Sequence, residues 1–155
     1  AVPAGESRRL RRLSLITLAL IYVQTIFGAV LRHTGERLDA HLLFAALVTI
    51  HVFLLAAKIL RRSPGRQSLH RYAHALWILL MIQLGLGAGS FMVKYTSVGD
   101  AVIPWTITLL TAAHVVGGAL IFAVMISLAI RLQRDHYLNW ELPSGEPFLE
   151  HASAS

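Results

Sequence analysis

Residues 101–130 read AVIPWTITLLTAAHVVGGALIFAVMISLAI and contain no Asp, Glu, Lys or Arg. A helix needs about 20 consecutive apolar residues to cross the hydrocarbon core of a bilayer. Three other stretches, 13–31, 40–57 and 72–93, also lack these four residue types. The stretch 40–57 is short, but Lys58 can extend it by placing its ammonium group in the interface. The sequence therefore predicts four membrane-spanning helices.

The composition supports this interpretation. Of the 155 residues, 55% are hydrophobic and only 14% are charged, whereas soluble domains contain about 25% charged residues. The length suits a single domain. The chain has no cysteine, which excludes disulfides, thiolate metal sites, iron–sulfur clusters and covalent attachment of haem.

The basic residues gather at alternate ends of the predicted helices. Only Arg32, Arg37 and Lys94 lie at the opposite ends, and the positive-inside rule then places both termini in the cytoplasm and the loops 32–39 and 94–100 outside. The net charge of +6 is explained by this pattern, so no nucleic-acid partner is expected. The cytoplasmic set comprises Arg8, Arg9, Arg11, Arg12, Lys58, Arg61, Arg62, Arg66, Arg71, Arg131 and Arg134.

The loops between the predicted helices are short, so consecutive helices should pack antiparallel. The predicted fold is an all-α, integral-membrane, antiparallel four-helix bundle that crosses the inner (cytoplasmic) membrane several times. We expect a basic cytoplasmic segment over 1–12, the transmembrane bundle over 13–132 and a polar C-terminal tail over 133–155. The lipid bilayer is the first expected partner.

A weak internal repeat relates the two halves of the chain. QTIFGA (24–29) and QLGLGA (83–88) share a Gln-x-x-x-Gly-Ala pattern. The first precedes a helix that contains His41, and the second precedes a helix that contains His114. Parallel repeats of this kind are related by an axis along the membrane normal, so the pattern predicts a two-fold internal repeat.

Histidines are the strongest candidates for chemistry, because polar groups within a bilayer are costly and often functional. Haem can be held between two histidines on facing helices of a bundle. Carboxylates are scarce in the predicted spans, which disfavours a di-iron carboxylate site. We therefore expect one b-type haem; a second near His70 and His74 lacks an obvious facing histidine. Six histidines lie in or beside the spans: His33, His41, His51, His70, His74 and His114.

His114 is the best candidate for an iron ligand. It lies about ten residues into the last helix, roughly 15 Å from its outer end. Gly117 and Gly118 share its helix face and would leave room for a flat macrocycle, although small residues also serve ordinary helix packing. For the second ligand, spacing alone leaves His41 and His51 open, and either could instead make an interhelical hydrogen bond.

Other residues could complete the haem site. Gln24 and Gln83 could bond a polar edge of the ligand or each other, and Gly28 and Gly87 flatten the same helix faces. The propionates of a haem need cationic partners, and the outer cations Arg32, Arg37 and Lys94 suit that role. We expect His33, beyond the first span, to be a propionate or supporting contact rather than an iron ligand.

The stretch QTIFGAVLRHTGERLDAHLLFAALV (24–48) resembles the haem A synthase family, whose eight-helix members consist of two similar four-helix halves. The resemblance covers residues 14–132 and includes an LxxAH pattern that ends at His114. The two helix-borne haem ligands of the family fall on His41 and His114. The resemblance therefore implies a haem held by this pair, with His51 as the rival to His41.

Two departures separate the chain from the catalytic half of that family. That half has a glutamate three residues before its histidine, where this chain has Leu38, and a cysteine-containing loop, where GERLDA (35–40) stands here. The resemblance is thus closer to the haem b-binding half, and catalysis is left open.

Three functions remain as hypotheses. The first is a haem b protein for electron transfer, working with other membrane subunits or as a homo-oligomer in a respiratory assembly. The second is a half-size haem A synthase that oxidises haem O to haem A, either as a homo-oligomer or by recruiting Glu36 or Asp39. The third is a haem-free accessory subunit.

Overall fold

The computed structural model describes the backbone of residues 4–62 and 67–141, and the side chains of residues 8–61 and 67–134. Its order is α1 (Ala4–Thr34), α2 (Leu38–Arg62), α3 (Gln67–Tyr95), the short 3-10 helix η1 (Ser97–Ala101) and α4 (Pro104–Glu141). The predicted all-α class is confirmed. The four α-helices are each long and apolar enough to cross a membrane, as the charge-free stretches predict.

The helices extend beyond the apolar stretches at both ends. α1 begins at Ala4, inside the predicted basic segment, and α4 continues through Glu141, inside the predicted tail. Hydropathy marks the residue at which a helix leaves the hydrocarbon core of the bilayer. Arg, Gln and Leu beyond that point are good helix formers. The backbone hydrogen bonds of the helix therefore continue past the boundary. The rest of the predicted tail, 142–155, lies outside the described residues.

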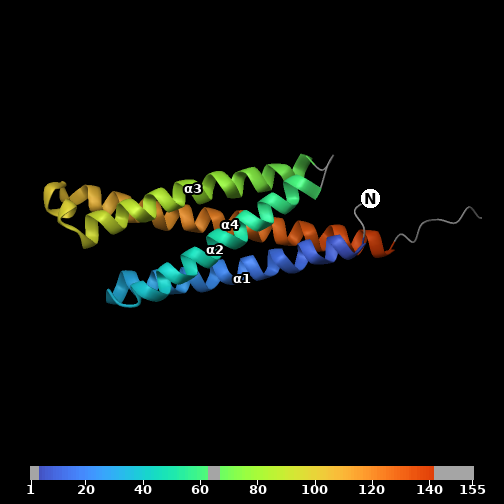
Figure 1. Ribbon diagram of the computed structural model, residues 1–155, viewed down its shortest axis with the longest axis horizontal. Coiled ribbons are helices and arrows are strands. Elements are labelled where there is room, and N and C mark those ends of the chain that lie inside the picture. Colours follow the sequence, from blue (N-terminus) through green and yellow to red (C-terminus); the bar gives the residue numbers. More distant parts are fainter. Residues whose placement is uncertain (1–3, 63–66, 142–155) are drawn as a thin grey trace, which may run out of the picture.

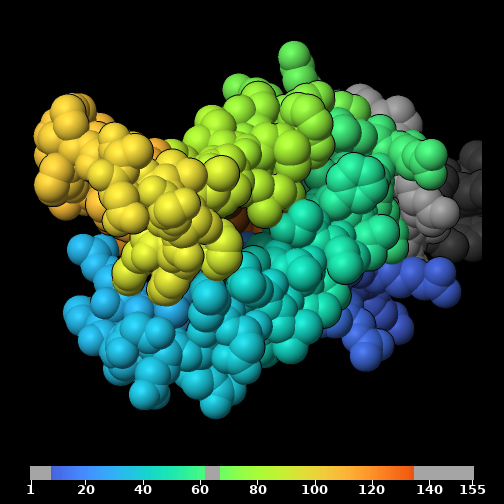
Figure 2. All heavy atoms as spheres, turned by 60° about the vertical axis from the view of Figure 1, so that its left-hand side comes forward, coloured from blue at the N-terminus to red at the C-terminus, as the bar shows by residue number. Residues whose placement is uncertain are grey.

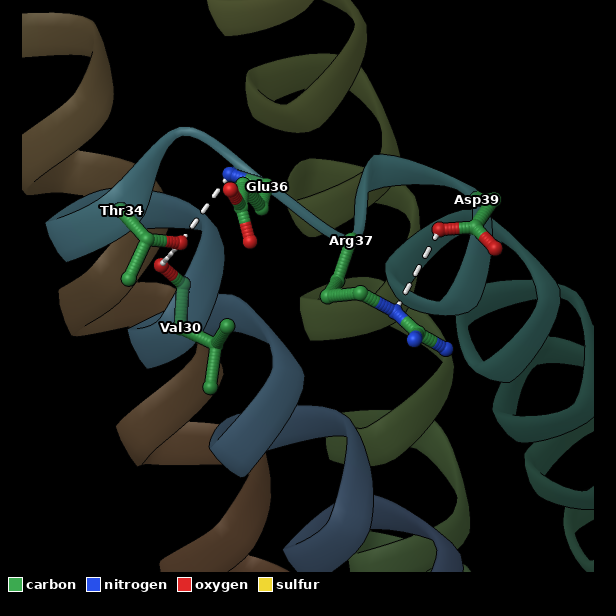
Figure 3. A network of polar contacts seen from close by, with 5 residues as sticks. All are labelled: Val30, Thr34, Glu36, Arg37 and Asp39. Atoms are coloured by element: carbon green, nitrogen blue, oxygen red, sulfur yellow. Dashed lines mark hydrogen bonds and ion pairs between the residues drawn. The ribbon is translucent and has the colours of Figure 1, made fainter.

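A tight turn joins α1 to α2 (Figure 3). The hydroxyl of Thr34 donates to the Val30 carbonyl at 2.9 Å and accepts the amide of Glu36 at 3.1 Å. Gly35 then adopts a φ of 75°, which glycine tolerates because it lacks a Cβ atom. These contacts end α1 and reverse the chain.

Arg37 immediately precedes α2 (Figure 3). It has a φ of 64°, and its carbonyl accepts the amide of His41 at 3.0 Å, which closes the first helical turn. Its side chain lies 3.7 Å from the carboxylate of Asp39. The turn therefore sets the position of His41 at the beginning of α2.

Two helical hairpins, α1/α2 and α3/α4, make up the bundle. The most extensive contacts lie within each hairpin, followed by those of α1 with α4 and of α2 with α3. Figure 1 shows that the hairpins lie close together where α2 is followed by α3 and diverge toward the opposite end. The bundle is therefore closed at one end and splayed at the other.

The hydrophobic core occupies only the closed end. We call residues 8–21, 48–61, 67–80 and 121–134 the core half, and residues 22–47 and 81–120 the splayed half. Among the described residues, the splayed half contributes only Ala40 and Val93 to the buried apolar set. The core cluster itself consists of Leu10, Ile21, Val48, Val52, Leu55, Ala56, Ile59, Leu69, Ala73, Leu76, Leu80, Ile121, Met125, Leu128 and Leu132.

The outward faces of the helices are apolar. Large side chains such as Phe53, Trp77, Leu109 and Ile130 are exposed. Contiguous exposed apolar surface of this kind marks contact with a membrane or another protein. Together with the four long apolar helices, it indicates that the bundle lies in a lipid bilayer.

Stability should depend on the core half. Leu55 is fully buried, whereas its neighbour Leu54 is 50% exposed. We expect Leu55→Ala to lower the free energy of unfolding by about 2 kcal/mol or more, since it leaves a cavity. Unfolding in mixed micelles with increasing denaturing detergent measures the change. Leu54→Ala is the matched control, and an equal loss in both variants would contradict this account of the core.

Candidate functional site

Four polar side chains occupy the splayed half, one from each α-helix. They are Gln24 of α1, His41 of α2, Gln83 of α3 and His114 of α4. All four are partly buried. The sequence repeat places them at corresponding positions of the two hairpins, and the fold brings them together.

The two imidazoles lie close to each other. The ring centroids of His41 and His114 are 6.3 Å apart, and the ring planes are inclined at 79°. One ring comes from each hairpin, so the pair connects the two halves of the bundle at the point where they diverge. Figure 2 views this end of the molecule and shows a furrow between the outer ends of α1/α2 (blue and cyan) and those of α3/α4 (yellow and orange).

Each imidazole packs against a glycine of the neighbouring helix. A Cβ atom placed on Gly28 would lie 3.2 Å from Cε1 of His41, and one placed on Gly87 would lie 2.9 Å from Cε1 of His114. Ordinary Cβ contacts are longer than either distance. The glycines of the two Gln-x-x-x-Gly-Ala patterns are therefore needed where the rings meet the backbone.

Each imidazole also meets a glutamine. The amide nitrogen of Gln24 lies 3.4 Å from Nε2 of His41, and that of Gln83 lies 3.5 Å from Nε2 of His114. The glutamines thus contact the histidine of their own hairpin. The sequence left open a bond between the two glutamines or to a ligand, and the contact with histidine was not predicted.

Gly117 and Gly118 face the side chain of Gln83. A Cβ atom on Gly118 would lie 3.2 Å from the amide nitrogen of Gln83, and one on Gly117 would come closer still to its amide oxygen. The amide nitrogen donates to the backbone carbonyl of His114 at 2.8 Å. In the structure, these two glycines therefore make room for an amide from α3.

Several buried polar atoms of the site have no hydrogen-bond partner. They are Nδ1 of both imidazoles and Oε1 of both glutamines. Buried polar groups are nearly always paired, and each exception calls for an explanation. Two such atoms in each hairpin mark this part of the bundle as a candidate site for a polar or metal-containing ligand.

Ser90 is a partly buried residue of this region that was not predicted from the sequence. Its hydroxyl oxygen is buried and has no partner. It follows Gln83 by seven residues and Gly87 by three, so all three share one face of α3. That spacing was the available signal, but serine is common in membrane helices as a packing residue.

Two of the remaining histidines, His51 and His74, make local bonds, whereas Nε2 of His70 is buried without a partner. Nδ1 of His51 donates to the Leu47 carbonyl at 2.8 Å, and Nδ1 of His74 donates to the His70 carbonyl at 2.8 Å. Each of these is a bond to the backbone of the same helix. The ring of His114 therefore lies close to that of His41. One ring nitrogen of His51 is already hydrogen-bonded to the backbone of its own helix.

The charged candidates lie at the splayed end of the bundle and are exposed. Arg32 and His33 lie in the last turn of α1. Arg37 pairs with Asp39 (Figure 3), and the Nζ atom of Lys94 lies 5.6 Å from the ring centroid of Tyr95. These cations are accessible from the splayed end but touch neither imidazole in any contact of the described residues.

A groove between α2 and α3 differs from the candidate site. It has a volume of about 170 Å³ and an almost wholly apolar lining formed by Phe53, Ala56, Ala57, Leu60, His74 and Trp77. It opens on the outer surface of the core half. An apolar groove of this size and position suits a lipid chain better than it suits chemistry.

The imidazole pair can hold a metal only with help from other ligands. Within the described residues, no group of three or more His, Cys, Asp or Glu side chains surrounds one point. A metal–imidazole bond is about 2 Å long, so two imidazoles on opposite sides of one ion have ring centroids roughly 6 Å apart. The observed separation of 6.3 Å is of this size, with the Nδ1 atoms beside Gly28 and Gly87 and the Nε2 atoms beside the two glutamines. The site therefore suits an ion that brings its other ligands with it.

Comparison of the chain with protein-family models, with curated proteins and with solved structures found no match in any of the three.

Proposed function

We propose that the splayed half binds one b-type haem, with His41 and His114 as the two axial iron ligands. A porphyrin supplies the four nitrogens that the protein does not, and imidazole is a common iron ligand. The observation that carries this proposal is the pairing of the two rings, one from each hairpin, with centroids 6.3 Å apart.

Three further features support the proposal. The glycines Gly28 and Gly87 allow backbone and rings to approach closely. The buried Nδ1 atoms of both rings lack a partner. Buried apolar side chains close the core half but not the splayed half. These features suit a flat, mostly apolar group between the hairpins.

The function that follows from two axial histidines is electron transfer. When bound, a haem with both axial positions filled by protein exchanges single electrons and offers no open position to oxygen. His41 and His114 would hold it, and Gly28 and Gly87 would leave room beside the two rings. The exposed cations Arg32, Arg37 and Lys94 are the proposed partners of its propionates.

We also propose that the chain is related to the haem b-binding half of haem A synthases. The catalytic alternative has less support, because Leu38 stands where the catalytic half has glutamate. Glu36 and Asp39 are both exposed, and Asp39 pairs with Arg37. An electron carrier needs a donor and an acceptor, so we propose other membrane subunits, or a second copy of the chain, as partners.

The proposed haem site contains a two-fold internal repeat. Gln24, Gly28 and His41 make the same kinds of contact in the first hairpin as Gln83, Gly87 and His114 make in the second. The proposed axis runs along the membrane normal and between the two imidazoles. In the cytoplasmic membrane, both termini then face the cytoplasm and the splayed end faces outward.

This orientation can be tested with single cysteines, because the chain contains none of its own. Ser97→Cys lies in η1 at the splayed end, and Gln67→Cys lies at the start of α3 at the closed end. A membrane-impermeant maleimide added to intact cells should label Ser97→Cys and should label Gln67→Cys only after lysis. The reverse pattern would contradict the proposed topology.

The haem itself is tested by titration. Purified protein in detergent should bind one equivalent of haem b, with a Soret shift that saturates at a 1:1 ratio. Acid–acetone extraction of the natively purified protein should yield haem b. Saturation at two equivalents would contradict the single site, and extraction of haem A would favour the synthase.

A further inference from the structure

We infer that Gln24 and Gln83 are positioning residues that act on the two histidines, and that they act unequally. Gln24 sets the orientation of the His41 ring and how strongly that ring donates electrons to the iron. Gln83 mainly holds α3 against α4. This inference rests on the proposed haem site. It concerns residues whose sequence pattern is the same in both hairpins but whose surroundings differ.

The shared part of their role is contact with an imidazole. Among the described residues, the amide of Gln24 is the group hydrogen-bonded to the His41 ring, and the amide of Gln83 is the group hydrogen-bonded to the His114 ring. A histidine that ligates a metal through one nitrogen is oriented by the partner of its other nitrogen, and that partner also sets how strongly the ring donates electrons. The glutamines are placed for this task.

Gln24 is free to serve as donor or acceptor. A glutamine amide has an NH₂ donor and a carbonyl acceptor, and a half-turn about its last bond exchanges them. The Oε1 atom of Gln24 is buried and unpartnered. The half-turn would therefore place this oxygen beside the N–H of His41. It would lose only the 3.4 Å contact between the amide nitrogen of Gln24 and Nε2 of His41.

Gln83 does not have this freedom. Its NH₂ group donates to the His114 carbonyl at 2.8 Å, and a half-turn would bring two oxygens together. Gly117 and Gly118 form the notch that admits the amide. These glycines follow His114 by three and four residues, and the same offsets from His41 fall on Phe44 and Ala45. Only the second hairpin therefore has the notch, and Gln83 is fixed in one orientation.

The test compares matched variants of both glutamines. Gln24→Glu and Gln83→Glu replace the donor with a second acceptor, and Gln24→Met and Gln83→Met remove the hydrogen bond at similar volume. Thr25→Val is the control, because the Thr25 hydroxyl bonds only its own helix in the described contacts, at the Ile21 carbonyl. Each variant is measured for haem reduction potential, haem affinity and melting temperature before haem is added.

We expect Gln24→Glu to lower the midpoint potential, because a stronger acceptor makes the ring more electron-donating to iron. Gln24→Met should raise the potential and weaken haem binding about 10-fold. Gln24→Met, which adds no charge to the span, should keep the haem-free melting temperature of the parent protein. Gln83→Glu and Gln83→Met should lower that temperature, since they break the bond to the His114 carbonyl. Thr25→Val should change none of these quantities.

The outcomes separate this inference from the haem proposal. If the parent protein takes up no haem, the proposed function itself fails. If the parent binds haem but both Gln24 variants keep its potential, the positioning role is wrong. If the Gln24 and Gln83 variants lower the haem-free melting temperature equally, the two residues are equivalent and the unequal roles are overturned.

Discussion

Replacement of either His41 or His114 by alanine should abolish the low-spin haem spectrum. In the proposed site each ring would supply one ligand to the iron, and the two rings, one from each hairpin, lie with centroids 6.3 Å apart and planes inclined at 79°. Loss of one ring leaves the iron with a single protein ligand. We therefore expect high-spin residual haem at most, measured as loss of the reduced α-band in protein purified from cells supplied with a haem precursor.

His51→Ala provides the internal control for this experiment. His51 is also a partly buried histidine of α2, but its Nδ1 atom donates to the Leu47 carbonyl. The variant should retain the full spectrum. Loss of the spectrum in His51→Ala, with retention in His41→Ala, would show that the ligand pair is wrong.

The second large effect is expected at Gly87. A Cβ atom there would lie 2.9 Å from Cε1 of His114, so the branched side chain of Gly87→Leu has to displace the imidazole. Overpacking of this kind costs about 1–3 kcal/mol, which corresponds to about 5- to 150-fold weaker haem binding. Titration of the purified variant with haem measures the affinity.

Gly85→Leu is the matched control, because a Cβ atom on Gly85 has no neighbour within 4 Å. It lies on the same helix, two residues away, and undergoes the same change of composition. Equal loss of haem affinity in the two variants would mean that leucine in this part of α3 disturbs the helix rather than the site.

The four helices are the part of the structure that the sequence predicts best. Stretches such as 101–130 carry no charge, and only a helix satisfies every backbone group in hydrocarbon. Their ends were harder to predict, because a helix does not stop where the bilayer does. Arg131 and Arg134, for example, lie inside α4 rather than after it.

The residues of the candidate site were named from the sequence, but the contacts between them could not be. Spacing along the chain could not choose between His41 and His51, since that choice depends on how α2 is rotated against its neighbours. The partner of Gln24 depends on the same rotation. Helix packing in membranes is decided by side-chain fit between helices, which no single stretch of sequence contains.

The divergence of the two hairpins at one end of the bundle also could not be predicted from the sequence. All four spans are apolar along their length, yet the buried side chains gather between residues such as Leu55, Leu76 and Met125 in the core half. In the other half, glycines, glutamines and histidines face the interior instead. This contrast within each helix, rather than its mean hydropathy, marks the candidate site.

The most direct test of the central claim is the visible spectrum of the purified protein, recorded oxidised and then reduced with dithionite. The proposed site predicts a Soret band and, on reduction, the sharp α- and β-bands of a low-spin haem with two histidine ligands. Folded protein purified from haem-replete cells that shows no Soret band, and gains none when haem is added, would contradict the account.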